Sequence, residues 1–191
     1  MTKYNHIYRN IFKRLEDNLD QKFPYHNSEH TNLVLKRARE IAEAEGINGR
    51  DSTLIEIAAL FHDSGFLISR EEHEERGCEL AEKELADEDF SEEDIKSICG
   101  MIRATKIPQS PKNQLESVLA DADLYYLGTD EYDKYASLLY RELKDFNPGL
   151  SDEEWVKIQI KFLESHRYTT DFAKINLEPT KKVHLERIKR L

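Results

Sequence analysis

The chain is poor in the residues and segments that mark several large classes of protein. Only two cysteines, Cys78 and Cys99, occur among its 191 residues. Both lie inside helical patterns, which indicates buried free thiols and argues against a disulfide framework. No stretch approaches the roughly 20 apolar residues of a membrane span, and the amino terminus lacks the apolar segment of a signal peptide. We therefore expect a cytoplasmic protein that does not enter a membrane.

Positive charge is also in short supply. The 28 Lys and Arg residues are outnumbered by 38 Asp and Glu residues, which gives a formal net charge of −10 at pH 7. A surface this acidic is repelled by a phosphate backbone, so we expect no general nucleic-acid binding. A small phosphorylated partner stays compatible with this charge if a bound cation supplies the attraction locally. A homo-oligomer is left open.

Glycine and serine are too sparse for a linker or a low-complexity segment, and no internal repeat is present. No segment alternates apolar and polar residues in the manner of a β-strand. The length falls within the usual range of about 100 to 200 residues for one domain. The sequence therefore predicts a single all-α domain over residues 1–191.

Apolar residues at steps of three and four predict a series of amphipathic helices. The first covers residues 4–19 and ends before Pro24. Ser28 is the expected N-cap of the second, which stops at Gly46. Residues 54–61 are apolar nearly all round, so the helix that they form must lie in the core.

Polar caps and prolines indicate where the later helices begin and end. A capping-box pattern at Ser69–Glu72 predicts the start of the fourth helix. Ser91 begins the next one, whose inward row extends to Lys106 before Pro108. The remaining helices are expected at residues 115–126, about 130–145, 152–165 and 177–190.

Two histidines and a set of aspartates suggest a metal site assembled from three segments. They are His30, the pair His62-Asp63, and the run Asp121-Ala122-Asp123. A His-Asp pair is common by chance, but this one ends an apolar helix, where an unpaired carboxylate is costly and a cation relieves the cost. Imidazole and carboxylate ligands together suit Mn, Fe, Co, Ni or Zn, with Mg as a further option.

The choice between the two later aspartates follows from helix geometry. At about 100° per residue, Asp123 lies about 85° from the centre of the apolar face and Asp121 about 115°. Asp123 is therefore the expected ligand. Asp121 either supports the ligands from behind or is a surface carboxylate.

These motifs resemble those of the HD-domain metal-dependent phosphohydrolase superfamily. The resemblance rests on His30, His62-Asp63 and Asp123, and it extends from Tyr25 to Tyr168-Thr169-Thr170 in the expected order. More narrowly, the chain is similar to small bacterial proteins described as predicted metal-dependent HD-superfamily phosphohydrolases. The resemblance implies a compact helical bundle with a metal-site core at about 25–130 and C-terminal helices packed on it.

The resemblance also implies roles for individual residues. The metal ligands would be His30, His62, Asp63 and Asp123, holding one tight ion, with a second ion left open. The stretch Tyr25-His26-Asn27-Ser28-x-His30 is similar to one in cyclic-nucleotide phosphodiesterases, where the histidine corresponding to His26 protonates the leaving oxygen. His26 and Asp63 are thus the expected catalytic residues, although a plain turn histidine is the alternative for His26.

Three further residues are candidates for contact with the substrate or a second ion. His73 and Glu74 can face the same interior as the metal ligands from the start of the fourth helix. Lys106 could hold a substrate phosphate as a point charge, unless it reaches out to solvent. The other histidines lie in polar surroundings and are expected at the surface: His6, His166 and His184.

The sequence therefore predicts a metal-dependent phosphohydrolase that acts on a nucleotide or another small phosphate ester through metal-activated water. A phosphodiesterase is the nearest alternative, and a non-catalytic sensor of metal or nucleotide with the same fold is another. Relatives with a di-iron centre oxidise their substrates, but they need more histidines, and the segment Ala104-Thr105-Lys106 lacks the one that often follows there.

Overall fold

The computed structural model describes residues 4–19 and 22–191, and these form helices with no β-strand among them. The prediction of an all-α fold is thus confirmed. Within the described residues no helix is both long enough and apolar enough to span a membrane. The α-helices are α1 Asn5–Asn18, α2 Ser28–Ala44, α3 Gly49–Phe61, α4 His73–Leu85, α5 Glu92–Ala104, α6 Gln114–Asp123, α7 Tyr132–Phe146, α8 Asp152–Ser165, α9 Asp171–Asn176 and α10 Glu178–Ile188, with 3-10 helices η1 Ser64–Leu67 and η2 Tyr125–Gly128.

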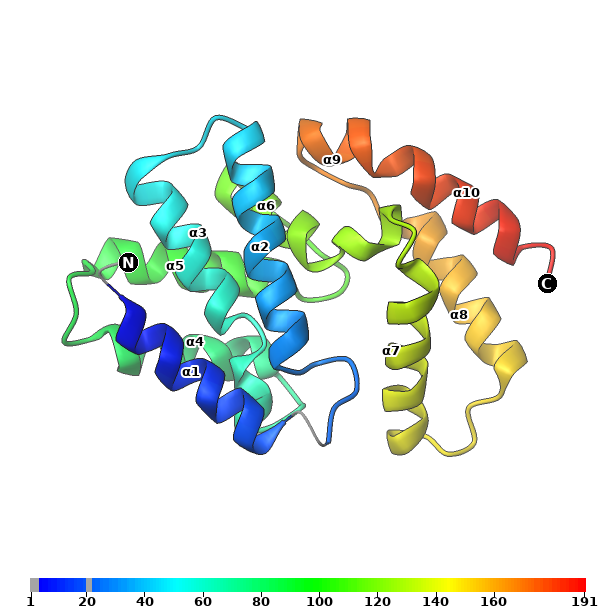
Figure 1. The fold of residues 1–191 in the computed structure, drawn as a ribbon, viewed down its shortest axis with the longest axis horizontal. Helices are drawn as coiled ribbons and strands as arrows, with labels where there is room; N and C mark the ends of the chain where they lie inside the picture. The colour runs from blue at the N-terminus through cyan, green and yellow to red at the C-terminus, as the bar shows by residue number, and fades with distance from the viewer. Residues whose placement is uncertain (1–3, 20–21) are drawn as a thin grey trace.

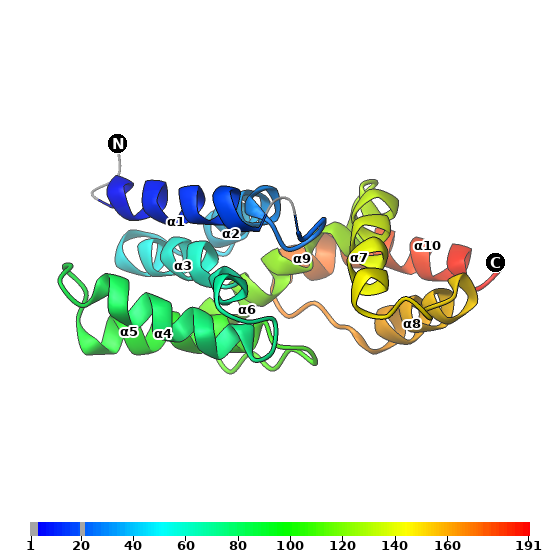
Figure 2. The same cartoon turned by 90° about the horizontal axis from the view of Figure 1, so that it is seen from below.

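Helix α3 lies at the centre of the N-terminal part of the molecule. Figure 2 shows it between α1 and α2 on one side and α4 and α5 on the other. Every residue from Leu54 to Phe61 is buried except Glu56, as its apolar composition predicted. The chain that leaves α3 therefore enters the core at His62.

The C-terminal helices α7–α10 lie beside the first six helices (Figure 1). One connected cluster of buried apolar side chains reaches from Ile7 in α1 to Ile188 in α10. Polar contacts cross the same boundary, because Asp121 of α6 accepts hydrogen bonds from Thr169 and Thr170 ahead of α9. The segment between α8 and α9 thus holds the C-terminal part of α6 in place.

Several helix ends follow the sequence. Ser91 begins α5 as predicted and forms a complete capping box with Asp94. The pattern Ser151-x-x-Glu154, which predicts the start of the helix at 152–165, also forms a complete capping box. Gly46 has φ +74° and follows the end of α2, which is the left-handed conformation that glycine favours at this position.

Two predicted caps are wrong. Ser28 is the first residue of α2, and its neighbour Asn27 is the N-cap, accepting a hydrogen bond from the His30 amide. The expected capping box at Ser69 does not form, because the Ser69 hydroxyl accepts from the Glu71 amide within a turn. Glu72 then adopts φ 54°, so α4 begins only at His73.

The helix expected at 115–126 is shorter than predicted and ends at Asp123. Leu124 leaves the helical conformation, and residues Tyr125–Gly128 form η2. The buried Tyr168 hydroxyl donates to the Leu124 carbonyl at 3.0 Å, so this oxygen is satisfied from outside the helix. Asp123 at the end of the helix lies beside His30, whereas Tyr125 after the break donates to Glu40.

Replacement of Gly128 by alanine should destabilise the fold by about 1 to 3 kcal/mol, as overpacking of a core usually does. A Cβ atom at this position would lie 2.5 Å from both the Cβ atom and the carbonyl oxygen of Leu177. Gly149→Ala is the matched control, because the nearest atom to its Cβ would be 3.6 Å away. Denaturant unfolding of both variants measures the difference, and equal midpoints would contradict the proposed packing of η2 against Leu177.

Candidate metal centre and its pocket

Four side chains from three segments meet at helix ends near the centre of the molecule. His30 lies in the first turn of α2, held there by the Asn27 cap. His62 directly follows α3, and Asp63 precedes η1. Asp123 is the last residue of α6. The structure therefore brings together the four residues that the sequence motifs suggested as ligands.

The distances between these side chains match those of ligands that share an ion. His30 Nε2 lies 3.3 Å from His62 Nε2 and 3.2 Å from Asp123 Oδ1. Asp63 Oδ2 lies 3.3 Å from His30 Nε2 and 3.2 Å from His62 Nε2. Atoms that each bind an ion at about 2.0–2.2 Å are separated by about 3.0–3.5 Å. His30, His62 and Asp123 thus form a cluster that could hold a metal.

Hydrogen bonding sets the orientation of His62. Its Nδ1 lies 2.8 Å from the Ala59 carbonyl oxygen, which can only accept, so Nδ1 carries the proton. In the neutral ring Nε2 then presents its lone pair to the centre of the cluster, as a metal ligand requires. The three-residue spacing from Ala59 at the end of α3 fixes this geometry.

The electrostatics of the cluster also fit a cation. Burial opposes a charge on His30, but the carboxylates of Asp123 and Asp63 outweigh it and raise the pKa of His30 to about 10. Burial likewise opposes ionisation of Asp63, but His62 and His30 hold its pKa well below the usual range. The site therefore favours negative charge on Asp63 together with a compensating positive charge.

An unsatisfied oxygen marks where that positive charge belongs. Asp63 Oδ2 is buried and has no hydrogen-bond partner in the described part of the chain. The nearby Nε2 of a neutral His62 presents a lone pair. Asp63 Oδ2 and His62 Nε2 therefore repel each other unless a proton or a cation lies between them. This donor set of two imidazoles and two carboxylates fits a divalent transition metal.

The choice of Asp123 over Asp121 agrees with this geometry, but the helical-wheel reason for it is wrong. Asp121 is the more buried residue, at 0% exposure against 15% for the Asp123 side chain. Helix α6 is covered on several sides, and the segment before α9 covers the face that carries Asp121. The Asp121 carboxylate accepts hydrogen bonds from the backbone amides and hydroxyls of Thr169 and Thr170. Burial outweighs these bonds and raises the pKa of Asp121.

Asparagine at each of these aspartates should therefore separate metal binding from stability. Asp123→Asn is expected to lose most bound metal while the chain stays folded. Asp121→Asn should keep its metal but lose about 1 to 3 kcal/mol of unfolding free energy, because it leaves buried donors poorly matched. Metal content per folded chain and denaturant unfolding decide between the two. Greater metal loss from Asp121→Asn would reverse the assignment.

His26 lies beside the cluster and is held by a residue that the sequence reasoning missed. Its Nδ1 is 2.5 Å from Glu142 Oε1 of α7, and the other Glu142 oxygen accepts from the backbone amides of Tyr25 and His26. Burial opposes ionisation of Glu142, but the His26 hydrogen bond outweighs it and lowers the pKa of Glu142. The His26 ring stacks on Phe66. The centroid of the His26 ring is 5.9 Å from the centroid of the His30 ring.

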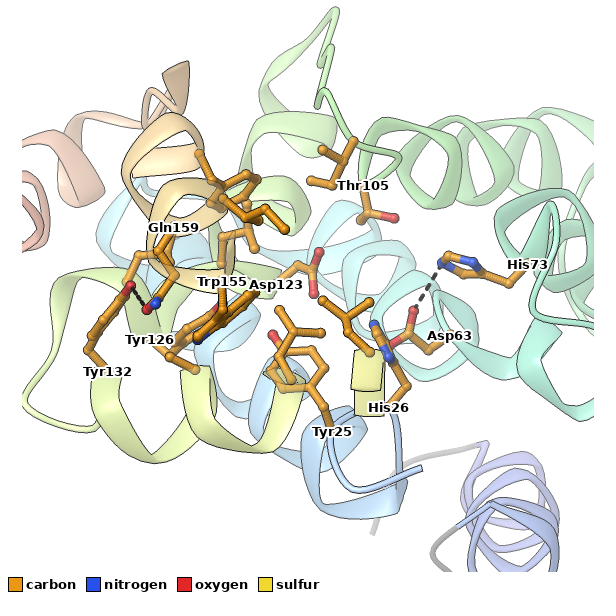
Figure 3. Close-up of a pocket in the computed structure, with 18 of the residues that line it drawn as sticks. Tyr25, His26, Asp63, His73, Thr105, Asp123, Tyr126, Tyr132, Trp155 and Gln159 are labelled. Carbon is orange, nitrogen blue, oxygen red and sulfur yellow. Dashed lines mark hydrogen bonds and ion pairs between the residues drawn. The ribbon is translucent and has the colours of Figure 1, made fainter. Parts of the chain in front are cut away.

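His73 and Glu74 also lie next to the cluster, as expected. His73 donates through Nδ1 to the Arg70 carbonyl at 3.2 Å, so its Nε2 faces the carboxylates. That atom is 3.6 Å from Asp63 Oδ1 and 3.5 Å from Glu74 Oε1. One oxygen of Asp63 therefore faces His30 and His62. The other oxygen faces His73, and Figure 3 shows this pair.

Of the two alternatives for Lys106, the structure favours the one in which the side chain reaches solvent. Helix α5 ends at Ala104, so the inward row does not continue, and Lys106 is exposed. Thr105 is buried instead, and it lines the pocket beside the cluster.

The expectation for His166 is also wrong, because it is buried. Its Nδ1 lies 3.2 Å from Nζ of the buried Lys181. Burial and the nearby Lys181 and Arg167 lower the pKa of His166 to about 3. His184 is half-buried and lies 2.9 Å from the Thr129 carbonyl, whereas His6 is exposed as expected.

A pocket of about 440 Å³ opens onto the cluster. Its polar end is lined by Asp63, Asp123, His26, His73, Glu74 and Thr105. The other end is formed by apolar and aromatic side chains of η2, α7 and α8, and Figure 3 shows Asp123 between the two groups. The volume lies within the range of about 300–1,000 Å³ that is usual for small-molecule sites.

Comparison with known proteins identifies the family. Residues 27–139, more than half of the chain, match the model of the HD domain, and the chain belongs to this family. The family places it in a superfamily of metal-dependent hydrolases. The matched range contains all four residues of the cluster, while His26 and Glu142 lie just outside it.

The fold is similar to that of the crystal structure of a predicted HD superfamily hydrolase from an uncultured Thermotogales bacterium. The TM-score is 0.64 at 22% sequence identity, and the match covers 98% of this chain and 90% of that one. A search among curated proteins gives no match.

Proposed function

We propose that this protein is a metal-dependent phosphohydrolase that cleaves a small phosphate ester. One observation carries the proposal: Asp63 and Asp123 of the cluster line the same pocket as His26, which Glu142 holds in place. A cation-binding cluster and a proton donor on one pocket are the two parts that hydrolysis of an ester needs.

In this proposal the four clustered residues hold one divalent transition metal tightly. When bound, such an ion lowers the pKa of water and polarises a phosphoryl oxygen. Asp63 has a second task, because its Oδ1 faces the pocket side of the cluster and can accept a proton from the attacking water. His73 and Glu74, next to that oxygen, would contact the water or the phosphate.

His26 completes the reaction. Water adds its oxygen to phosphorus and gives up a proton, and the bond between phosphorus and the leaving oxygen breaks. The carboxylate of Glu142 accepts from Nδ1 of His26 and stabilises the ring in its doubly protonated form, whose Nε2 donates a proton to the leaving oxygen. The products are an alcohol and phosphate. Asp63 then releases its proton to solvent, and His26 takes one up from solvent.

The test is elemental analysis of the purified protein joined to a hydrolysis screen. The metal-stripped protein is reloaded with Mn²⁺, Fe²⁺, Co²⁺, Ni²⁺, Zn²⁺ or Mg²⁺ and assayed on phosphate monoesters and on bis(nitrophenyl) phosphate. We expect one ion per chain and metal-dependent release of phosphate from monoesters. Turnover of the diester alone would favour a phosphodiesterase. Stoichiometric metal without any turnover would favour a binding module and would overturn the proposed reaction.

A further inference from the structure

The pocket that serves the metal cluster has a second, apolar end. Its walls come from η2, α7 and α8, three elements that contribute none of the four clustered residues. The largest of the side chains there are Tyr126, Tyr132, Leu139, Leu143, Trp155 and Phe162. In Figure 3, Tyr126, Tyr132 and Trp155 gather on the side of Asp123 opposite to Asp63 and His73. A ligand with phosphorus at the cluster would extend its organic part toward these walls.

Fixed positive charge is scarce around this pocket. Among the described residues that line it, Arg70 alone is an arginine or lysine. Arg70 is exposed and stacks on Phe146, with its guanidinium carbon 4.1 Å from the ring centroid. One arginine together with a metal ion can balance one phosphate group. A chain of two or three phosphates would meet no further fixed cation on these walls, so the pocket suits a single phosphate.

Hydrogen-bonding groups are equally scarce at the apolar end. The hydrogen-bonding groups there are Gln159 and the polar tips of Tyr126, Tyr132 and Trp155, and the Gln159 Oε1 already accepts from the Tyr132 hydroxyl at 2.8 Å. A sugar or glycerol placed here would give up its hydrogen bonds with water for contacts with leucine and phenylalanine, which is costly. A methylene group gains from the same transfer, by about fourfold in affinity for each one buried.

We infer that the substrate is a hydrophobic phosphate monoester, whose leaving alcohol is apolar and occupies the apolar end of the pocket. This inference rests on the proposed function for the position of the phosphate. It narrows the substrate class, because it disfavours polyphosphates, sugar phosphates and other polyol phosphates. The apolar wall recognises the alcohol, and the metal cluster recognises the phosphate.

The chain contains a built-in reporter for this test. Trp155 is its only tryptophan, it lines the apolar end, and it stacks on Tyr140 with centroids 5.3 Å apart. Its fluorescence can follow the binding of methyl-, butyl- and octylphosphonate to the Mn²⁺-loaded protein, because the C–P bond is not hydrolysed. Affinity should rise about fourfold per methylene from methyl to butyl and further to octyl. Ribose 5-phosphate should bind no better than methylphosphonate.

A matched pair of variants locates the effect. Ile158 lines the apolar end and is 45% exposed, whereas Ile175 on α9 is 72% exposed and does not line the pocket. Ile158→Glu should weaken octylphosphonate at least tenfold and leave methylphosphonate nearly unchanged. Ile175→Glu should affect neither ligand. Because both isoleucines are exposed, neither change should disturb the fold, which circular dichroism can verify.

The outcomes separate this inference from the proposed function. Hydrolysis of monoesters with no dependence of binding on chain length would overturn the inference and leave the proposed function intact. The same holds if ribose 5-phosphate binds as tightly as octylphosphonate, or if both glutamate variants behave alike. Chain-length-dependent binding without any hydrolysis would support the apolar site but overturn the phosphohydrolase.

Discussion

Replacing His62 or Asp63 by alanine is expected to abolish stoichiometric metal binding and to reduce hydrolysis to the level of the metal-free protein. His62 directs Nε2 at the cluster through its bond to Ala59, and Asp63 approaches both imidazoles with one oxygen. Loss of a group that merely supports a ligand costs 10- to 100-fold in metal affinity or activity, so loss of a ligand should cost more. Elemental analysis of folded protein gives the metal content directly.

Thermal unfolding supplies a second readout that does not depend on turnover. A ligand that binds only the folded state stabilises it by about 2.7 kcal/mol when present at 100 times its dissociation constant. Added metal should therefore raise the Tm of the parent chain and leave that of both variants unchanged. His6→Ala is the control, because His6 is exposed and its ring pairs with Glu88 and not with a residue of the cluster. Variants at His62 and Asp63 that fold and bind metal like the parent would show that the cluster is not the metal site.

The residues of this cluster could be predicted from the sequence, because local sequence features identify them. His62 and Asp63 follow a helix that is apolar on nearly all sides, which places them in the core regardless of how the other helices pack. The helical series was predictable for the same reason, since apolar spacing and serine caps act over a few residues. Errors arose at helix ends, where Glu72 takes a left-handed conformation and Leu124 ends α6 early.

The residues that contact this cluster were harder to predict from the sequence, because tertiary contacts determine which side chains meet. The position of Asp121 on the helical wheel suggested that it is less buried than Asp123. In the structure, however, the segment at Thr169 and Thr170 covers Asp121. Glu142 lies 116 residues from His26. It belongs to an amphipathic helix, where an acidic residue is normally expected to face solvent. Nothing in the local sequence distinguishes a buried glutamate of this kind from an exposed one.

Loss of the His26 side chain should leave metal binding intact and slow hydrolysis in a way that depends on the leaving group. Removal of a general acid typically costs about 10²- to 10⁴-fold in rate. The loss should be largest for an alkyl phosphate, because an alkoxide needs a proton to depart. It should be small for nitrophenyl phosphate, since nitrophenolate leaves readily without one. Comparison of kcat/KM for the two substrates in the parent and in His26→Ala measures the effect.

Glu142→Gln tests whether the same role depends on the carboxylate behind His26. The amide oxygen can still accept from Nδ1 but carries no negative charge to stabilise a protonated ring. We expect a smaller loss than for His26→Ala, again greater for alkyl than for nitrophenyl phosphate, with metal content unchanged. A merely structural role for Glu142 would instead slow the hydrolysis of both substrates equally, because a displaced loop at Tyr25 and His26 disturbs the whole pocket.

Equal losses on both substrates in His26→Ala, with metal retained, would remove the acid role and leave His26 as a residue that positions the substrate.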